Sequence, residues 1–342
     1  MASPSSFDQL DHSKLFKAPV SNKEESMMQE ELTLLCMLDH HERIKDLPPQ
    51  SWYWVKHRDW IAKQIESARK GNYGIARNVP HLLCLTQKER QTEIMRLRAE
   101  LVKLPRGPMA TGVARVRDNC EALFTGKADP LSLLLRGNTL TRIYDVGSFD
   151  HSDFMQAFSQ AKPNLKVLEV GAGTGGTTAK FLKELRSYER YTFSDLSAGF
   201  FPRARQRFSY ANGMDFKAFD VSKSPASQGL DLAFYDLVIA PQVLHATPSL
   251  RETLSNVRSL LLPGGYLVLT ETSTEGRTTH YFFGIFEGWW LGEADGRTDG
   301  PCVSPERWDK ELRAAGFSGV DQCVMDADAP FNFCALMVSR AV

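Results

Sequence analysis

The 342-residue sequence has no surplus of charge of either sign, because 41 lysines and arginines balance 41 aspartates and glutamates. A nucleic-acid or membrane-surface protein would normally carry a basic excess, so neither partner is expected. No run approaches the roughly 18 apolar residues of a spanning helix. The N-terminus also lacks the basic stretch and apolar run of a secretory signal. These absences together predict a cytoplasmic protein.

The sequence has six cysteines but no C-x-x-C spacing, which excludes the usual zinc and iron–sulfur sites. They are expected to be reduced thiols. No cluster of aspartate and asparagine ligands follows the predicted strands, so no metal is expected either. The cysteines are Cys36, Cys84, Cys120, Cys302, Cys323 and Cys334.

The first 135 residues contain almost no strand signal. Residues 1–22 are polar and are expected to form a flexible tail. Residues 23–135 carry apolar positions at helical spacing, interrupted by prolines, which predicts a helical N-terminal subdomain or lid. Its aromatic cluster is expected to pack helices together rather than to form a substrate platform. That cluster comprises Trp52, Tyr53, Trp54 and Trp60, and the predicted helices include Glu30–Met37, Trp60–Ala68, Glu89–Leu104 and Ala128–Leu135.

The remainder, residues 136–342, alternates short apolar runs with helical patterns, which is typical of βαβ units and a mainly parallel sheet. The last two of seven predicted strands have no helix between them and are expected to form an antiparallel hairpin. The prediction is therefore an α/β, Rossmann-like, seven-stranded class I methyltransferase core. The predicted strands are Lys166–Val170, Tyr191–Ser194, Met214–Ala218, Tyr235–Ala240, Tyr266–Thr270, Ser318–Met325 and Ala335–Ser339.

A glycine-rich turn, VLEVGAGTGGTT, joins the first predicted strand to a helix. Its glycines also fit the dinucleotide pattern G-x-G-x-x-G, so the motif alone is ambiguous. Glu169, however, lies two residues before the first glycine, where a cationic ligand tail suits it better than a pyrophosphate. Asp195 ends the next strand and can accept both hydroxyls of a ribose. These features favour S-adenosylmethionine, with S-adenosylhomocysteine as product.

A third carboxylate, Asp220, follows the third strand and could meet the adenine amino group, with Val221 against the ring. A plain turn aspartate is the alternative. Ala240-Pro241-Gln242 stands where a small polar run is more usual before VLHAT, and Gln242 could contact the cofactor tail or a substrate oxygen. The predicted cofactor-binding set is Glu169, Gly171, Ala172, Gly173, Thr174, Gly175, Asp195, Leu196, Asp220, Val221 and Gln242.

Several motifs resemble the C-methyltransferase domain of fungal highly reducing polyketide synthases over about residues 120–325. They are DPLSLLL, VLEVGAGTGGTT, YTFSDLSAGFF, VLHAT, LLPGGYLVLTE, FGIFEGWWLGEADGR and SPERWDKELRAAGFSGVD. The resemblance implies α-methylation of a β-ketoacyl intermediate on an acyl carrier protein. The Met-Ala-Ser start favours a separate protein that acts in trans and contacts a polyketide synthase transiently. The sequence ends directly after the last predicted strand, so a further domain could follow.

The resemblance also implies a catalytic pair, His245 after the fourth strand and Glu271 at the end of the fifth. Both fall at carboxyl ends of neighbouring strands, where open α/β sheets place their sites. A neutral imidazole is suited to removing an α-proton. Glu271 would accept a hydrogen bond from the other ring nitrogen. A helix-capping or core role is the alternative for His245.

Residues 276–303 form an aromatic insertion after the fifth strand that is expected to cover the active site. It could line an acyl channel or pack as a lid on the N-terminal helices. The candidate substrate-contacting residues are Tyr144, which could also cover the cofactor, and Phe283, Phe286, Trp289 and Trp290.

Two other functions remain open. An O-methyltransferase acting on a hydroxyl or enol of a free natural product would use the same base. A catalytically silent docking module is the second alternative, although the intact His245 and Glu271 argue against it. Metal-dependent catechol methylation is disfavoured because no ligand cluster is present, and N-methylation because Pro241-Gln242-Val243 stands where its motif would lie.

Overall fold

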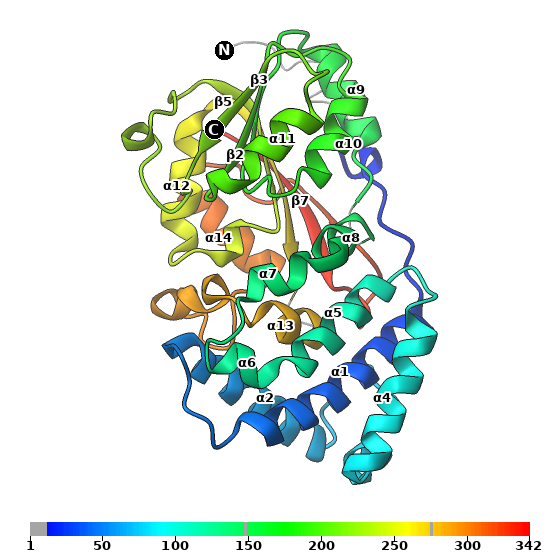
Figure 1. The fold of residues 1–342 in the computed structure, drawn as a ribbon. Coiled ribbons are helices and arrows are strands. Elements are labelled where there is room, and N and C mark those ends of the chain that lie inside the picture. Colours follow the sequence, from blue (N-terminus) through cyan, green and yellow to red (C-terminus); the bar gives the residue numbers. More distant parts are fainter. Residues whose placement is uncertain (1–11, 147–148, 274–275) are drawn as a thin grey trace.

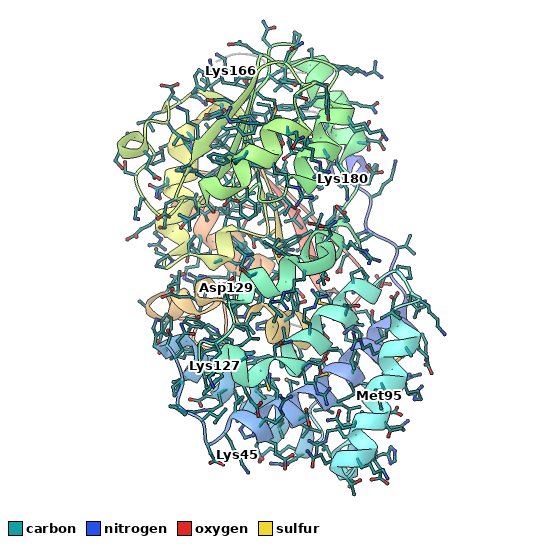
Figure 2. All side chains as sticks on the ribbon, viewed as in Figure 1. Lys45, Met95, Lys127, Asp129, Lys166 and Lys180 are labelled. Atoms are coloured by element: carbon teal, nitrogen blue, oxygen red, sulfur yellow. The ribbon has the colours of Figure 1, made fainter. Side chains whose placement is uncertain are left out.

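The computed structural model describes residues 12–146, 149–273 and 276–342. A sheet flanked by helices fills one half of the molecule, and a layer of helices fills the other (Figure 1). Lys166, at the start of the first strand, and Lys45, after the first long helix, mark opposite ends (Figure 2). We call the two halves the sheet core and the helical layer.

The sheet core contains seven strands in the order β3-β2-β1-β4-β5-β7-β6. The first five are parallel, and β7 is antiparallel to both β5 and β6. The strand order reverses between β1 and β4, where α/β sheets bind their ligands. The strands are β1 (Lys166–Glu169), β2 (Arg190–Asp195), β3 (Met214–Ala218), β4 (Tyr235–Pro241), β5 (Leu261–Thr272), β6 (Gln322–Met325) and β7 (Cys334–Arg340).

Alternate residues of the buried strands supply two apolar cores, one on each face of the sheet. Val167 and Val268 face one cluster with phenylalanines of α9 (Ser152–Ala161) and α10 (Gly176–Glu184). Leu168 and Leu267 face the other, with side chains of α12 and α14. Further helices of this half are α11 (Phe201–Arg207), α12 (Leu250–Leu260), α14 (Pro305–Ala314), η2 (His12–Leu15), η4 (Ala198–Phe200), η5 (Ala226–Gln228) and η6 (Leu244–Ala246).

The helical layer has its own apolar core, which joins two distant parts of the sequence. Buried side chains from Met28 to Ile143 pack with Tyr281, Phe282, Trp289 and Trp290 of the insertion. The elements are α1 (Lys23–Ile44), α2 (Trp52–Arg69), α3 (Val79–Cys84), α4 (Gln87–Leu101), α5 (Gly107–Asp118), α6 (Cys120–Phe124), α7 (Pro130–Leu135), η3 (Arg136–Asn138), α8 (Thr139–Val146), α13 (Arg277–Phe283) and η7 (Glu287–Asp295).

The predicted fold class is confirmed, including the terminal antiparallel hairpin. The insertion packs on the N-terminal helices, as expected from the second of the two alternatives given for it above. Of the aromatic cluster, Trp54 and Trp60 are buried between helices, while Trp52 is 46% exposed. Strand ends differ most for β5, which begins at Leu261 because that residue already pairs with Tyr235 before a register shift.

The expected tail over residues 1–22 is wrong for part of its length. Residues 1–11 lie outside the described part of the chain. Phe16 is 5% exposed and stacks on Phe154 of α9 with ring centroids 4.8 Å apart. Lys17 pairs with Asp150 through two backbone hydrogen bonds. Burial of the Phe16 ring removes apolar surface from water, and this holds the otherwise polar segment against the sheet core.

Candidate active site

The glycine turn after β1 needs glycine at two positions, where φ is positive and neighbouring side chains lie close to the backbone. Gly171 has φ +68°, and a Cβ there would lie 2.2 Å from Val243 Cγ2. Gly175 has φ +77°, and its Cβ would lie 2.7 Å from Phe208 Cε2. Both the left-handed backbone and the close packing therefore exclude a larger residue. The contact with Val243 also joins this turn to the loop that carries His245.

Glu169 is fully buried at the end of β1. Its Oε2 accepts hydrogen bonds from Thr178 Oγ1 at 2.6 Å and Tyr191 Oη at 2.7 Å. Its Oε1 is buried and has no hydrogen-bond partner. Burial, only partly offset by these hydrogen bonds, raises the pKa of Glu169 to about 7. A buried carboxylate oxygen without a partner fits the cationic tail of a ligand.

Asp195 lies at the end of β2, beside the glycine turn. Its carboxylate accepts backbone N–H groups from Gly173 at 2.9 Å and Ser197 at 2.8 Å. Burial raises its pKa against these hydrogen bonds. Leu196, the next residue, is 73% exposed. The pair thus offers a held carboxylate and an open apolar surface, which suits a ribose and the purine beyond it.

Asp220 has a different setting from the other two carboxylates. Its Oδ1 accepts from the backbone and hydroxyl of Ser222, and its Oδ2 pairs with Lys223 at 2.9 Å. Burial opposes the shift, but the hydrogen bonds from Ser222 and Lys223 lower its pKa overall. The neighbouring Val221 is 6% exposed. Asp220 therefore has the contacts of a turn aspartate, the alternative weighed for it above.

His245 and Glu271 are in direct contact. His245 Nδ1 hydrogen-bonds to Glu271 Oε2, and the other carboxylate oxygen accepts the backbone N–H of Leu244 at 3.0 Å. His245 is 5% exposed and Glu271 is 1% exposed. The short η6 turn after β4 presents the ring to the carboxyl end of β5. This arrangement leaves Nε2 as the ring nitrogen that can exchange a proton with a ligand.

A buried arginine braces the same turn from the insertion. Arg297 is 5% exposed and donates to the carbonyl of His245 at 2.6 Å and of Thr247 at 2.5 Å. Asp295 accepts from its Nε at 3.0 Å. A Cβ on Gly292 would lie 2.5 Å from the guanidinium carbon, so the glycine of the WWLGE motif makes room for this arginine. Sequence reasoning missed Arg297, although its motif was singled out.

An aromatic wall extends from His245 towards Asp195. Trp289 lies edge-to-face with His245, with ring centroids 5.3 Å apart, and stacks on Phe283 at 5.7 Å. Phe283 stacks in turn on Tyr144 at 6.0 Å. Tyr144 is 41% exposed, and partial burial together with the nearby Asp195 charge raises the pKa of its hydroxyl. These rings form a continuous row of contacts that ends at His245.

Of the other two predicted substrate residues, Phe286 lies at the edge of that wall and Trp290 lies apart from it. Phe286 contacts Phe283 with centroids 6.5 Å apart. Trp290 is 4% exposed, and its Nε1 donates to the carbonyl of Gly284 at 2.8 Å. Trp290 therefore packs inside the helical layer, and its polar atom is already used there.

Gln242 has a left-handed backbone, with φ +58°. Its amide oxygen accepts from Thr272 Oγ1 at 2.6 Å, and its amide nitrogen donates to Cys334 Sγ at 2.6 Å. Strained non-glycine residues of this kind concentrate at functional sites. Its side chain nevertheless joins the ends of β5 and β7, on the opposite side of β5 from Glu271.

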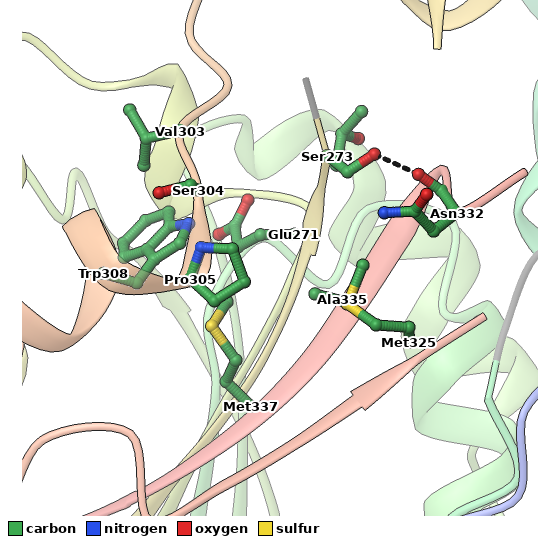
Figure 3. A pocket seen from close by; sticks show the side chains of 11 residues that line it. Glu271, Ser273, Val303, Ser304, Pro305, Trp308, Met325, Asn332, Ala335 and Met337 are labelled. Atoms are coloured by element: carbon green, nitrogen blue, oxygen red, sulfur yellow. Dashed lines mark hydrogen bonds between the residues drawn. The ribbon is translucent and has the colours of Figure 1, made fainter. Parts of the chain in front are cut away.

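A cavity of about 170 Å³ lies beside Glu271 and opens between the ends of β5 and β7 and the start of α14. Figure 3 shows Glu271 pointing into it between Trp308 and Ala335. It is lined by Glu271, Thr272, Ser273, Val303, Ser304, Pro305, Trp308, Met325, Asn332, Ala335 and Met337. Glu271 therefore borders this cavity on one side and contacts His245 on the other.

The structure brings the glycine turn, Asp195, His245 and Glu271 to one edge of the sheet. Within the described residues, no group of three or more His, Cys, Asp or Glu side chains is placed to hold a metal ion. In the same part of the chain, no helix is long and apolar enough to cross a bilayer. The residues present fit an S-adenosylmethionine molecule, with the partnerless oxygen of Glu169 suited to its cationic end.

The sequence is similar to a methyltransferase family and to enzymes of polyketide synthesis. The methyltransferase-domain family model matches residues 168–267. The chain is 44% identical over 320 residues to the highly reducing polyketide synthase gloL of Glarea lozoyensis, covering 91% of this chain but only 13% of that protein. It is 33% identical over 324 residues to the methyltransferase calH of Penicillium decumbens, covering 92% of this chain and 88% of calH.

The fold is also similar to two solved structures of methyltransferases. The trans-methyltransferase CalH in complex with S-adenosylhomocysteine matches with a TM-score of 0.91 and 34% identity, over 97% of this chain and 95% of that one. The CMeT domain of the citrinin polyketide synthase shares the fold, with a TM-score of 0.74 and 24% identity over 92% and 89% of the two chains.

Proposed function

The chain belongs to the family of S-adenosylmethionine-dependent methyltransferases that includes CalH and the C-methyltransferase region of highly reducing polyketide synthases, and from this membership we propose that it methylates carbon. The acceptor is the α-carbon of a β-ketoacyl intermediate on an acyl carrier protein. The similarity to carbon methyltransferases of polyketide synthesis carries the choice of carbon as acceptor, and the buried His245–Glu271 pair beside the glycine turn supplies the base that the reaction needs.

The turn after β1 would hold the cofactor. When bound, S-adenosylmethionine supplies an electrophilic methyl group on a sulfonium sulfur. Glu169 would hold its cationic tail, Asp195 would accept hydrogen bonds from the ribose hydroxyls, and Leu196 would cover the purine. Gly171 and Gly173 allow the backbone to approach it closely. Tyr144, which is 41% exposed, would cover the cofactor from the helical layer.

His245 removes the α-proton. A carbon between a ketone and a thioester must lose this proton before it can attack an electrophile, and an imidazole is matched to that task near pH 7. Nε2 takes the proton, while Glu271 fixes the tautomer through Nδ1 and stabilises the imidazolium. The imidazolium afterwards releases its proton to water, which restores the base.

The aromatic wall supports an acyl substrate. Phe283 and Trp289 form a largely apolar surface that ends at the catalytic imidazole, and it excludes water from the reacting carbon. Action in trans on a carrier-bound chain is proposed because CalH is described as a trans-methyltransferase and because other relatives are polyketide synthases. A transient contact with such a synthase follows from the same reasoning.

The test uses synthetic β-ketoacyl thioesters and a ¹³C-methyl-labelled cofactor. One substrate is loaded on a carrier protein, and the other is the free thioester. We expect NMR to show a ¹³C-methyl group bonded to the α-carbon, with the carrier-bound substrate used more efficiently. A ¹³C-methoxy signal alone would establish O-methylation instead. Equal efficiency with the two substrates would contradict recognition of the carrier.

A further inference from the structure

Buried ring nitrogens without partners lie next to the catalytic pair. His280 is 8% exposed, and neither of its ring nitrogens has a hydrogen-bond partner within the described chain. Trp289 is 4% exposed, and its indole nitrogen is also unpartnered there. Buried polar atoms in native proteins are nearly always paired, so each of these requires an explanation.

The two rings are arranged around one point beside His245. Trp289 contacts His245 edge-to-face, with centroids 5.3 Å apart, and His280 contacts Trp289 in the same manner at 5.3 Å. A Cβ added to Gly300 would lie 2.9 Å from His280 Nδ1 and 3.4 Å from Trp289 Nε1. Gly300 has φ +126°, so both its backbone and its surroundings keep a side chain out. The two nitrogens therefore lie close together on the side of Gly300, where no side chain of the described residues can reach them.

Other buried groups of the helical layer differ in this respect. Trp290, next in sequence, already donates its indole N–H to Gly284. His40 and His57 each use one ring nitrogen on Tyr281. Trp54 has an unpartnered indole nitrogen, but its ring contacts are with Tyr53, His57 and Phe124, away from His245. Only in the His280–Trp289 pair do unpartnered nitrogens adjoin the catalytic imidazole among the described residues.

The chemistry of the two side chains suits an anionic oxygen. An indole N–H is a donor only, and a neutral imidazole offers one N–H. Burial, with a smaller contribution from the charge of His245, lowers the pKa of His280 to about 4. His280 is therefore neutral at pH 7 and can donate a hydrogen bond without giving up a proton. Fixed donors of this kind stabilise charge that develops on a carbonyl oxygen.

We propose that Trp289 and His280 form a donor subsite for the substrate's carbonyl oxygen, and that this subsite stabilises the enolate formed when His245 removes the α-proton. The inference rests on the proposed carbon methylation. The α-carbon–hydrogen bond breaks, the proton goes to Nε2 of His245, and the electron pair is delocalised onto the carbonyl oxygen. When the carbon later attacks the methyl group, the oxygen returns to a neutral carbonyl, and its hydrogen bonds with the two donors weaken.

The experiment measures enolisation without methyl transfer. The protein is saturated with S-adenosylhomocysteine in D₂O, and α-deuteration of a β-ketoacyl thioester is followed by NMR. We expect Trp289→Phe and His280→Phe each to slow exchange about 100- to 1,000-fold, because a preorganised donor is lost. Phenylalanine keeps an aromatic ring at both positions, including the stack of residue 280 on Trp60. Trp54→Phe is the matched control, since it removes a buried, unpartnered indole N–H from the same helical layer.

The outcomes separate the two proposals. Slow exchange in both subsite variants, with wild-type exchange in Trp54→Phe and an unchanged Kd for S-adenosylhomocysteine, supports the subsite. Wild-type exchange in the subsite variants, or equal slowing in Trp54→Phe, overturns it while leaving carbon methylation intact. If His245→Ala exchanges as fast as wild type, the proposed base is wrong. If the wild-type protein catalyses no exchange, both proposals fail.

Discussion

The sheet core and the helical layer contribute to the site in different ways. In the sheet core, Asp195 and Glu271 sit at strand ends and have both oxygens occupied by hydrogen bonds. Most of the buried side-chain polar atoms without a partner lie instead in the helical layer, within the residues that the structure describes. The topology of the sheet therefore fixes the proposed reacting groups, whereas packing between distant segments shapes the surface proposed to meet the substrate.

The largest test of this division removes the base from the sheet core. We expect His245→Ala to lower kcat about 1,000-fold, within the range for loss of a general base. The Kd for S-adenosylmethionine, measured by calorimetry, should stay within about twofold of wild type because the proposed cofactor site is at the glycine turn. A parallel loss of cofactor affinity would show that binding and proton removal are not separable.

The next test breaks the contact between the glycine turn and the His245 loop. In Gly171→Ala the new Cβ would meet Val243. Overpacking of this kind costs about 1–3 kcal/mol, so cofactor affinity should fall about 10- to 100-fold. Gly137→Ala is the control, because Gly137 has a similar φ of +63° with nothing within 4 Å of its Cβ. Equal effects on the Kd in the two variants would attribute the loss to backbone strain alone.

A smaller effect is expected at the brace that crosses from the insertion to the sheet core. Arg297→Lys keeps the charge but cannot reach both the His245 and Thr247 carbonyls with one planar fork. Loss of one such hydrogen bond should lower kcat about tenfold. The cofactor Kd and circular dichroism report whether the change is local. An unchanged kcat would mean that Glu271 alone is enough to hold the turn.

The smallest predicted effect concerns pH and Glu169. Burial raises the pKa of this carboxyl from its ordinary 4.5 to about 7, so the folded protein holds its proton at pH 6. A cationic tail favours the ionised form, and the affinity for S-adenosylmethionine should rise about fivefold between pH 6 and pH 8. Glu169→Gln should flatten this profile in calorimetric titrations. A wild-type profile without slope would contradict a direct role for Glu169.

The same carboxyl has a consequence for stability in the absence of ligand. Between pH 4.5 and pH 7 the unfolded chain has already released the proton that the folded chain retains. The contribution of Glu169 to the free energy of unfolding therefore falls as pH rises through this window and levels off above it. Urea unfolding at several pH values, compared between wild type and Glu169→Gln, measures this difference.

Prediction from the sequence was strongest where backbone periodicity determines position. Each of the seven strands lies where a short apolar run predicted one, as does the final hairpin. The His245–Glu271 pair was implied by the family resemblance, and its contact is consistent with two neighbouring strand ends. Arg297 was missed because its role depends on a guanidinium crossing to the turn that carries His245. No periodic pattern reports such a contact between residues 52 positions apart in the sequence.

The sequence also could not predict which contacts each side chain makes. Nothing in the letters distinguishes Trp289, which faces His245, from Trp290, which is hydrogen-bonded inside the helical layer. Asp220 and Asp195 likewise follow strands in the same manner, but only Asp220 is paired with a neighbouring lysine. Phe16 was placed in a tail because one apolar residue in a polar segment carries no pattern.

The composition of the helical layer's core also constrains how the protein is synthesised. Its N-terminal helices pack against side chains from Tyr281 to Trp290, which leave the ribosome long after Ile143. At typical translation speeds this interval lasts roughly 7 to 30 seconds. During that time the apolar faces of the early helices have no native cover, so the nascent chain is expected to be a substrate for holding chaperones.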